Sequence, residues 1–272
     1  MAISRRVFLT DLGAVSVGAL VLTVSGCTSS GDGGADDASS GRGSGGSASS
    51  SEPSSAAQSS SAASSEPSSG TSSATTARLQ RVNLGFVSAY VVARGGAAAI
   101  VDTGVAGSAE DIGAVVTGLG LRWSDIGDVV LTHKHPDHAG SLADVLKQAG
   151  GAKAWAGAAD VAAIDAGGPA VTALNDGDSV FGLRVVATPG HTAGHICLLD
   201  PFAGFLLAGD ALNGGAGGKV EGPDPQFSED MSAAVASVRK LGRLTFDTVV
   251  FGHGEPVRGA ASKKVAALAK TL

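Results

Sequence analysis

The pattern of apolar and polar positions divides the chain into three parts. An apolar stretch runs from Leu12 to Val24, and from Thr28 to about Thr76 the sequence contains almost no residue that could be buried. From Arg78 onwards, short apolar runs alternate with segments of helical spacing. The pattern predicts one folded domain over residues 78–272, because about 195 residues can bury most of their apolar surface in a single domain.

Within this domain, the spacing of apolar residues predicts both strands and helices. Short runs rich in β-branched residues predict buried strands over residues 89–93, 97–104, 128–132, 183–188, 195–200, 205–210 and 247–252. Helical spacing predicts helices over residues 108–119, 141–149, 158–166, 229–241 and 260–272. Ser108, three positions before Asp111, resembles a capping box. Strands mixed with helices along the chain predict an α/β layered domain.

Composition and charge narrow the class of partner. Apolar residues make up 43% of the chain and charged residues 16%, with a formal net charge of −6. No run of Lys or Arg extends beyond isolated pairs, so we expect no nucleic-acid partner. Two cysteines, Cys27 and Cys197, cannot form a disulfide framework, and Cys197 lies in an apolar run typical of a buried, inert thiol.

The N-terminal segment has the features of an export signal. Arg5 and Arg6 precede the apolar stretch Leu12–Val24, whose 13 residues are fewer than the roughly 20 needed to span a bilayer. We therefore expect a cleaved signal peptide over residues 1–26 rather than a transmembrane anchor. The opening SRRVFL resembles a twin-arginine signal, which implies export in the folded state.

The sequence VSGC, which ends at Cys27, resembles the lipobox of bacterial lipoproteins. The resemblance implies cleavage before Cys27, acylation of its sulfur and attachment to the lipid bilayer at the outer face of the cytoplasmic membrane. An ordinary secretory signal with an incidental cysteine is the alternative. Residues 27–77 are mainly Ser, Gly and Ala, with SSEPSS present twice, and they predict a disordered linker ahead of the domain.

The stretch LTHKHPDHAG, which follows a predicted strand, holds three of the six histidines of the chain. His133 and His135 are two positions apart in an extended segment, so their side chains point to the same side and could hold one cation. Pro136 favours an extended or turn backbone at His135. Asp137 and His138, beyond that turn, could serve a second cation.

Three further strand ends carry residues of the same kinds. His191 follows LRVVAT, Asp210 ends FLLAGD, and His253 ends the run DTVVFGH. Imidazole and carboxylate donors without thiolate suit zinc, with iron and manganese as alternatives. Seven donors are too many for one tetrahedral zinc ion but suit two divalent metal ions that share a carboxylate.

The combined pattern resembles the metallo-β-lactamase-fold hydrolases. HxHxDH after a strand, a lone histidine, an aspartate in GD and a histidine in GH match from about Val82 to Gly259, together with VDTG at Val101–Gly104. The resemblance implies an αββα four-layer sandwich with the site at one edge of its two sheets. It also implies that Asp210 lies between two metals, one held by His133, His135 and His191 and the other by Asp137, His138 and His253.

Three residues beside the motifs have other expected roles. Asp102, in VDTG, is expected to orient a ligand through hydrogen bonds. His195 starts a strand and lies outside the ligand set of the family, so we expect it to support the site from behind the ligands. Strand alternation turns Lys134 away from the neighbouring histidines, which predicts a solvated side chain.

The resemblance and the predicted metals together imply a reaction. Two divalent cations can hold a bridging water and generate hydroxide at neutral pH. We expect hydroxide to attack the carbonyl of a small-molecule ester, lactone, thioester or amide, with Asp137 as the catalytic residue that orients the nucleophile and helps to protonate the leaving group.

Several alternatives to this reaction stay open. Asp210 resembles the bridging aspartate of glyoxalase II-type, lactonase-type and phosphodiesterase-type members, whereas Asn213 stands where quorum-sensing lactonases tend to place a tyrosine. The other functions to consider are β-lactamase-like or phosphodiesterase activity, an iron-dependent oxygenase, and a non-catalytic metal-binding surface lipoprotein. No feature of the sequence indicates the oligomeric state.

Overall fold

The structure is a computed structural model that describes residues 77–272. The predicted signal peptide, Cys27 and the linker up to residue 76 lie outside the described residues. Ala77, which we expected to end the linker, is buried in the core, so the folded part begins before Arg78. Within residues 77–272, no helix combines the length and the apolar character needed to cross a membrane.

The first sheet has six strands in the order in which they occur along the chain. Strands β1 to β3 pair antiparallel, and β3 to β6 pair parallel. Their bounds are β1 Arg78–Asn83, β2 Ser88–Arg94, β3 Ala97–Val101, β4 Ile126–Leu131, β5 Lys153–Gly157 and β6 Val171–Leu174.

The second sheet also has six strands, in the order β14-β13-β10-β9-β8-β7. Only the β10–β13 pair is parallel. The bounds are β7 Ser179–Val180, β8 Leu183–Ala187, β9 Ile196–Asp200, β10 Phe205–Leu207, β13 Thr248–Val250 and β14 Val257–Arg258. A separate hairpin joins β11 Asn213–Gly215 to β12 Lys219–Glu221.

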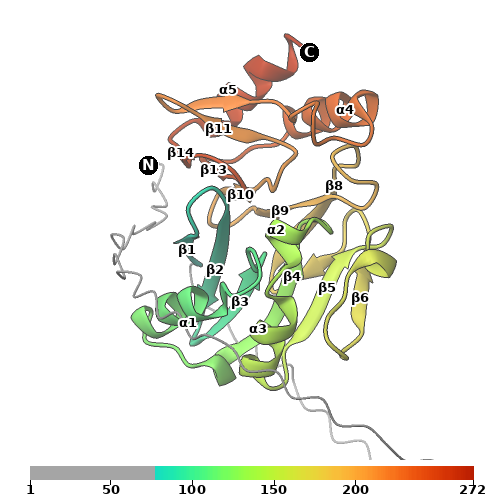
Figure 1. Cartoon of the computed structure of the whole chain (residues 1–272). Helices are drawn as coiled ribbons and strands as arrows, with labels where there is room; N and C mark the ends of the chain where they lie inside the picture. The colour runs from blue at the N-terminus through green and yellow to red at the C-terminus, as the bar shows by residue number, and fades with distance from the viewer. Residues whose placement is uncertain (1–76) are drawn as a thin grey trace, which may run out of the picture. The chain divides into compact units, whose positions relative to one another are not determined.

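Helices cover the outer faces of both sheets (Figure 1). Their bounds are α1 Ala109–Gly118, α2 Pro136–Ala139, α3 Leu142–Ala149, α4 Met231–Leu241 and α5 Ala261–Ala269. Two short 3-10 turns, η1 Trp123–Asp125 and η2 Val161–Ala163, lie in the connections.

The apolar residues form three cores, which confirms the predicted αββα sandwich. Strand β4 contributes to two of them, because Val129 and Leu131 pack with α1 and α3 while Val130 faces the second sheet. In the second sheet, Leu206 packs with α4 and α5, and Leu207 faces inward. Successive side chains of a strand point to opposite faces, so apolar runs of this kind belong in sheets covered on both faces.

Two predicted helical features are corrected by the structure. Residues 158–166 form only the turn η2, because Asp160 turns inward to accept hydrogen bonds from other loops and no regular helix can form around it. Ser108 precedes α1, but its side chain makes no capping hydrogen bond. Instead Ser108 is buried, and its backbone N–H donates to Oγ of Ser141 at 2.8 Å.

Candidate metal centre

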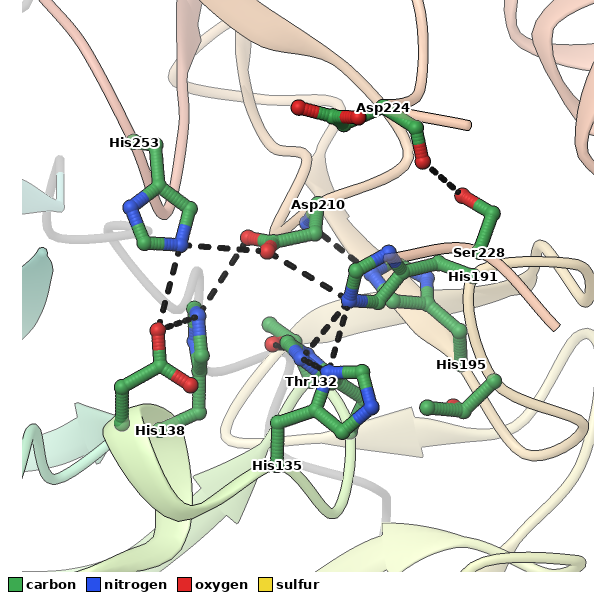
Figure 2. A network of polar contacts seen from close by, with 12 residues as sticks. Thr132, His135, His138, His191, His195, Asp210, Asp224, Ser228 and His253 are labelled. Carbon is green, nitrogen blue, oxygen red and sulfur yellow. Dashed lines mark hydrogen bonds and ion pairs between the residues drawn. The ribbon is translucent and has the colours of Figure 1, made fainter. Parts of the chain in front are cut away.

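Strand ends from both sheets meet at one edge of the sandwich and deliver the predicted residues there. His133 follows β4 of the first sheet, while His191, Asp210 and His253 follow β8, β10 and β13 of the second. Figure 2 shows His191, Asp210 and His253 converging on one centre. His135 directly precedes α2, and Asp137 and His138 lie within it, so the structure brings together all seven residues that the sequence suggested as ligands.

Three histidines form the first group, and their nitrogens lie in a triangle. Nε2 of His133 lies 3.1 Å from Nδ1 of His135. Nε2 of His191 lies 3.1 Å from Nε2 of His133 and 2.9 Å from Nδ1 of His135. Ligands at about 2.0–2.1 Å from a tetrahedral zinc ion are about 3.3 Å apart, so this spacing is close to that of a zinc site.

Asp137, His138 and His253 form the second group. Oδ2 of Asp137 lies 3.3 Å from Nε2 of His253 and 3.7 Å from Nε2 of His138. His138 is fully buried, whereas the side chains of Asp137 and His253 are 28% and 31% exposed. The second group is therefore the one more open to solvent.

Asp210 lies between the two groups and contacts both. Its Oδ2 atom is 3.4 Å from Nε2 of His191 and 3.2 Å from Nε2 of His253, and its Oδ1 atom is 3.3 Å from Nε2 of His138. Burial opposes ionisation of Asp210, but the adjacent His138 and His253 imidazoles outweigh it and hold the pKa of the carboxyl well below its usual value. One carboxylate can thus serve both groups.

A proline separates the residues of HxHxDH into the two groups. His135 has an extended backbone, with φ −64° and ψ 148°, as expected for a residue before proline. Pro136 is then the first residue of α2, where its missing N–H costs nothing. The single helical turn of α2 places Asp137 and His138 around the corner from His135.

Two glycines allow the strand ends to approach one another. A Cβ atom on Gly209 would meet His195 and Thr132, and one on Gly252 would meet Asp210 and His138. The backbone N–H of Gly252 donates to the carbonyl of Gly209 at 3.0 Å, which joins the two strand ends. The glycines of GD and GH therefore serve the close packing of the centre.

Asp102, which the sequence predicts to orient a ligand, contacts His138. Its Oδ2 atom lies 2.9 Å from Nδ1 of His138, and its Oδ1 atom accepts the N–H of Thr132 at 2.7 Å. Asp102 is buried and has a left-handed φ of 60°, an uncommon conformation for a residue other than glycine. With Nδ1 engaged, Nε2 of His138 faces the centre.

His195 lies behind the donor atoms and is fully buried. Its Nε2 atom accepts the backbone N–H of Asp210 at 3.0 Å, and its Nδ1 atom lies 2.8 Å from Oγ1 of Thr188. Burial lowers the pKa of His195 to about 3, so the ring is neutral at physiological pH. His195 therefore fixes the backbone at Asp210.

The pKa values of three further histidines at the centre are shifted, two downwards and one upwards. Burial lowers the pKa of His191 to about 4 and holds that of His133 well below its usual value. By contrast, hydrogen bonds to Asp137 and Asp210 raise the pKa of His253 to about 10. His133 and His191 thus supply neutral imidazoles at pH 7, and His253 carries a proton while no cation competes for it.

Unpaired buried atoms support a cation at this centre. Among the described residues, Nε2 of His138 and Oδ1 of Asp210 are buried with no hydrogen-bond partner, although they face each other. An uncompensated buried polar atom is costly, and native proteins rarely keep one without a reason. The donor set, with imidazoles and carboxylates but no thiolate, fits zinc, iron or manganese.

A buried carboxylate that the sequence analysis missed connects the loops of the first group. Asp160 accepts hydrogen bonds from the backbone N–H groups of Lys134 and Gly194, at 3.0 and 2.9 Å, and from Oγ1 of Thr192 at 2.6 Å. Lys134, expected to be solvated, instead pairs with Glu229 at 2.8 Å. Asp160 closely follows β5, and the run KAWAG was too short and too rich in alanine to indicate a strand.

The centre forms the floor of a cavity of about 570 Å³. Phe86, Asn213, Asp224 and Phe227 contribute to its wall, beside the predicted ligands Asp137, His191 and His253. A cavity of this size accommodates a small molecule rather than a polymer surface.

Comparison with known proteins identifies the family to which the chain belongs. The sequence matches the Metallo-beta-lactamase superfamily over residues 82–253. Hydroxyacylglutathione hydrolase of Acidiphilium cryptum is 37% identical over 152 residues, which are 54% of this chain and 58% of that protein. Thioesterase pkgB of Emericella nidulans is 29% identical over 172 residues, which are 62% of this chain and 46% of that protein. This chain spans about half the length of the relatives it matches.

Solved structures share the fold. The crystal structure of TTHA1623 in a di-iron-bound form has a TM-score of 0.52 and 26% sequence identity to this chain, covering 63% of this chain and 89% of that one. The αββα arrangement is therefore the one found in this group of proteins.

Proposed function

Since the chain belongs to the metallo-beta-lactamase superfamily, we propose that it is a dinuclear-metal hydrolase that cleaves a thioester-type bond in a small molecule. One observation carries the proposal: two groups of donors, with Asp210 between them, form the floor of a cavity of small-molecule size. Esters, lactones and amides contain the same kind of reactive carbonyl and fall within the proposed reaction type.

The proposed metal ligands follow the two groups. His133, His135 and His191 would hold one divalent ion, Asp137, His138 and His253 the other, and Asp210 would contact both. Bound ions of this kind polarise a carbonyl and lower the pKa of water. Zinc is the first choice for these donors, and the di-iron form of TTHA1623 supports iron as an alternative.

Asp137 is the proposed catalytic residue. It lines the cavity, and its side chain is partly exposed, so a substrate and a water molecule can reach it. The hydrogen bond from His253 lowers the pKa of Asp137, and the group is ionised at neutral pH. The carboxylate would orient the attacking water and take its proton, and it would return that proton to the departing thiolate when the C–S bond breaks.

The names of the relatives support a thioester. One matched relative is a hydroxyacylglutathione hydrolase and another is a thioesterase. Among the described residues that line the cavity there is no serine or cysteine, so water is the attacking group in the proposed reaction.

The experiment that tests this function uses the full chain and a panel of substrates. The panel contains acyl thioesters, an aryl ester, a lactone, a phosphodiester and a chromogenic cephalosporin. We expect thioester cleavage that disappears with a chelator, returns with zinc, and is absent in His133→Ala. Two bound metal equivalents without cleavage of any substrate would instead favour a metal-binding lipoprotein without catalysis.

We also propose that the protein acts at the outer face of the cytoplasmic membrane. The support is the resemblance of the first 27 residues to a twin-arginine signal with a lipobox at Cys27. Growth with a labelled fatty acid should label the protein, whereas Cys27→Ser should stay unlabelled and leave the membrane fraction.

A further inference from the structure

Exposed aromatic side chains concentrate at the cavity above the proposed metals. Residues 77–272 contain four large apolar side chains that are exposed, namely Phe86, Phe202, Phe227 and Leu272. Two of these, Phe86 and Phe227, line the cavity, and each is 65% exposed. Exposing a large apolar side chain forgoes burial energy, so two of them at the mouth of one site point to an apolar group of a ligand.

Backbone contacts hold both aromatic residues in place. The carbonyl oxygen of Phe86 accepts the Nδ1–H of His253 at 2.7 Å, and the Phe86 ring stacks on the His253 ring with centroids 6.1 Å apart. The N–H of Phe227 donates to the carbonyl of Asp224 at 3.3 Å, and Oγ of Ser228 donates to that same carbonyl at 2.7 Å (Figure 2). A ligand would thus meet positioned rings rather than loose ones.

The described part of the cavity wall has an acidic side chain outside the proposed ligand set but no Lys or Arg. Neither Lys nor Arg occurs among the described residues that line it, and Asp224 is the one acidic lining residue outside the proposed ligand set. Lys134, adjacent in sequence to two proposed ligands, is engaged by Glu229 at 2.8 Å. An anionic group on this wall, away from the proposed metals and their ligands, would therefore find no Lys or Arg to pair with among the lining residues that the structure describes, and it would meet the Asp224 carboxylate.

We infer that the substrate is a neutral or cationic thioester or ester with an apolar acyl group. The inference rests on the hydrolase function proposed above. The apolar acyl group packs against Phe86 and Phe227, and the Asp224 carboxylate in the same wall disfavours negative charge on the polar part of the substrate. The substrate class thus differs from carboxylate-bearing thioesters such as those of glutathione.

Binding of non-hydrolysable thioethers tests the inference independently of turnover. Three S-hexyl probes differ only in the polar end: 2-(hexylthio)ethylamine, its N-acetyl derivative and 3-(hexylthio)propanoate. Binding to the zinc-loaded full chain is measured by calorimetry, together with the S-methyl counterpart of the neutral probe. We expect the cationic probe to bind about tenfold more tightly than the anionic one, and hexyl about tenfold more tightly than methyl.

Matched variants assign the two preferences to residues. Asp224→Asn keeps the size of the side chain and should reduce the preference for the cationic probe over the anionic one to about threefold or less. Phe227→Ala should reduce the preference for hexyl over methyl. Phe202→Ala removes an exposed phenylalanine that does not line the cavity, and it should leave both preferences as they are.

The outcomes separate the inference from the proposed function. Equal or tighter binding of the anionic probe, or preferences that survive in Asp224→Asn and Phe227→Ala, would overturn the inference even if thioesters are hydrolysed. Conversely, the expected preferences in a protein that hydrolyses no thioester would support the binding site and reject the hydrolase function.

Discussion

Oδ2 of Asp102 lies 2.9 Å from Nδ1 of His138, inside the protein and below the proposed second metal. The contact leaves Nε2 of His138 as the atom that faces the centre. Loss of a carboxylate that orients a ligand in this way typically weakens metal binding by 10–100-fold. We therefore expect Asp102→Asn to bind zinc about 10–100-fold more weakly.

Competitive zinc titration against a chromophoric chelator checks this expectation. Asp128→Asn is the matched control, because Asp128 accepts a hydrogen bond from Trp155 at 2.8 Å and has no contact with the donor groups. Zinc affinity in Asp102→Asn equal to that of the control would contradict the role of Asp102.

We expect substitution of Asp160 to lower both the stability of the fold and the binding of metal. Its buried carboxylate accepts three hydrogen bonds that tie the loop of His133 and His135 to the loop of His191. Asp160→Asn replaces an acceptor with a donor facing a backbone N–H, which should lower the free energy of unfolding by about 1–3 kcal/mol. We also expect a smaller rise in Tm on adding zinc than in the unaltered protein.

Thermal unfolding with and without zinc measures both effects. Asp165→Asn is the control, because Asp165 accepts a hydrogen bond from Gly167 on an exposed loop. Asp160→Asn with an unchanged Tm and an unchanged zinc response would show that the buried carboxylate does not position the loops.

The two donor groups should differ in their response to pH. Burial lowers the pKa of His191 to about 4, whereas hydrogen bonds to Asp137 and Asp210 raise that of His253 to about 10. At pH 7 a cation in the second group must displace the His253 proton, while His191 has no proton to lose. Affinity of the second group should therefore fall as pH falls, by about tenfold per unit for each displaced proton.

Proton release on zinc binding, measured by calorimetry in buffers of different ionisation enthalpy, checks this order. The first equivalent of zinc should release fewer protons than the second at pH 7. Equal release for both equivalents would contradict the assignment of His253 to the second group.

Asp137→Asn should slow hydrolysis without unfolding the protein. The variant keeps the shape of the side chain but loses the base, and general acid–base catalysis typically contributes 10²–10⁴-fold. We expect kcat for a thioester to fall by about this factor. Asp144→Asn, on the exposed face of α3, is the control. Full activity and full metal content in Asp137→Asn would exclude the catalytic role.

The candidate metal ligands could be found from the sequence because they lie at or just after the ends of predicted strands. His133, Asp210 and His253 each lie at or just after the end of a predicted buried strand, and the resemblance to the metallo-β-lactamase-fold hydrolases implied that these strand ends meet at one edge of the two sheets. The short strands β5 and β6 were not predicted, because KAWAG has no β-branched residue and VTAL is only four residues long. The role of Asp160 depends on β5 and was missed for the same reason.

Sequence patterns could not predict contacts between residues that are far apart in the chain. Alanine-rich spacing over residues 158–166 predicted a helix, but tertiary hydrogen bonds of Asp160 decided the local structure. Similarly, strand alternation turned Lys134 away from its histidine neighbours but could not reveal Glu229 as its partner. The convergence of Phe86 and Phe227 at one cavity also needed the fold, since the two residues are far apart in the chain.

The central claim is that two metal ions, held by the two donor groups and sharing Asp210, are needed for hydrolysis. The most direct measurement is stepwise addition of zinc to the metal-free full chain while thioester hydrolysis is followed. The account predicts saturation at two equivalents per chain, with activity that rises mainly with the second. Full activity at one equivalent, or activity that persists in excess chelator, would contradict it.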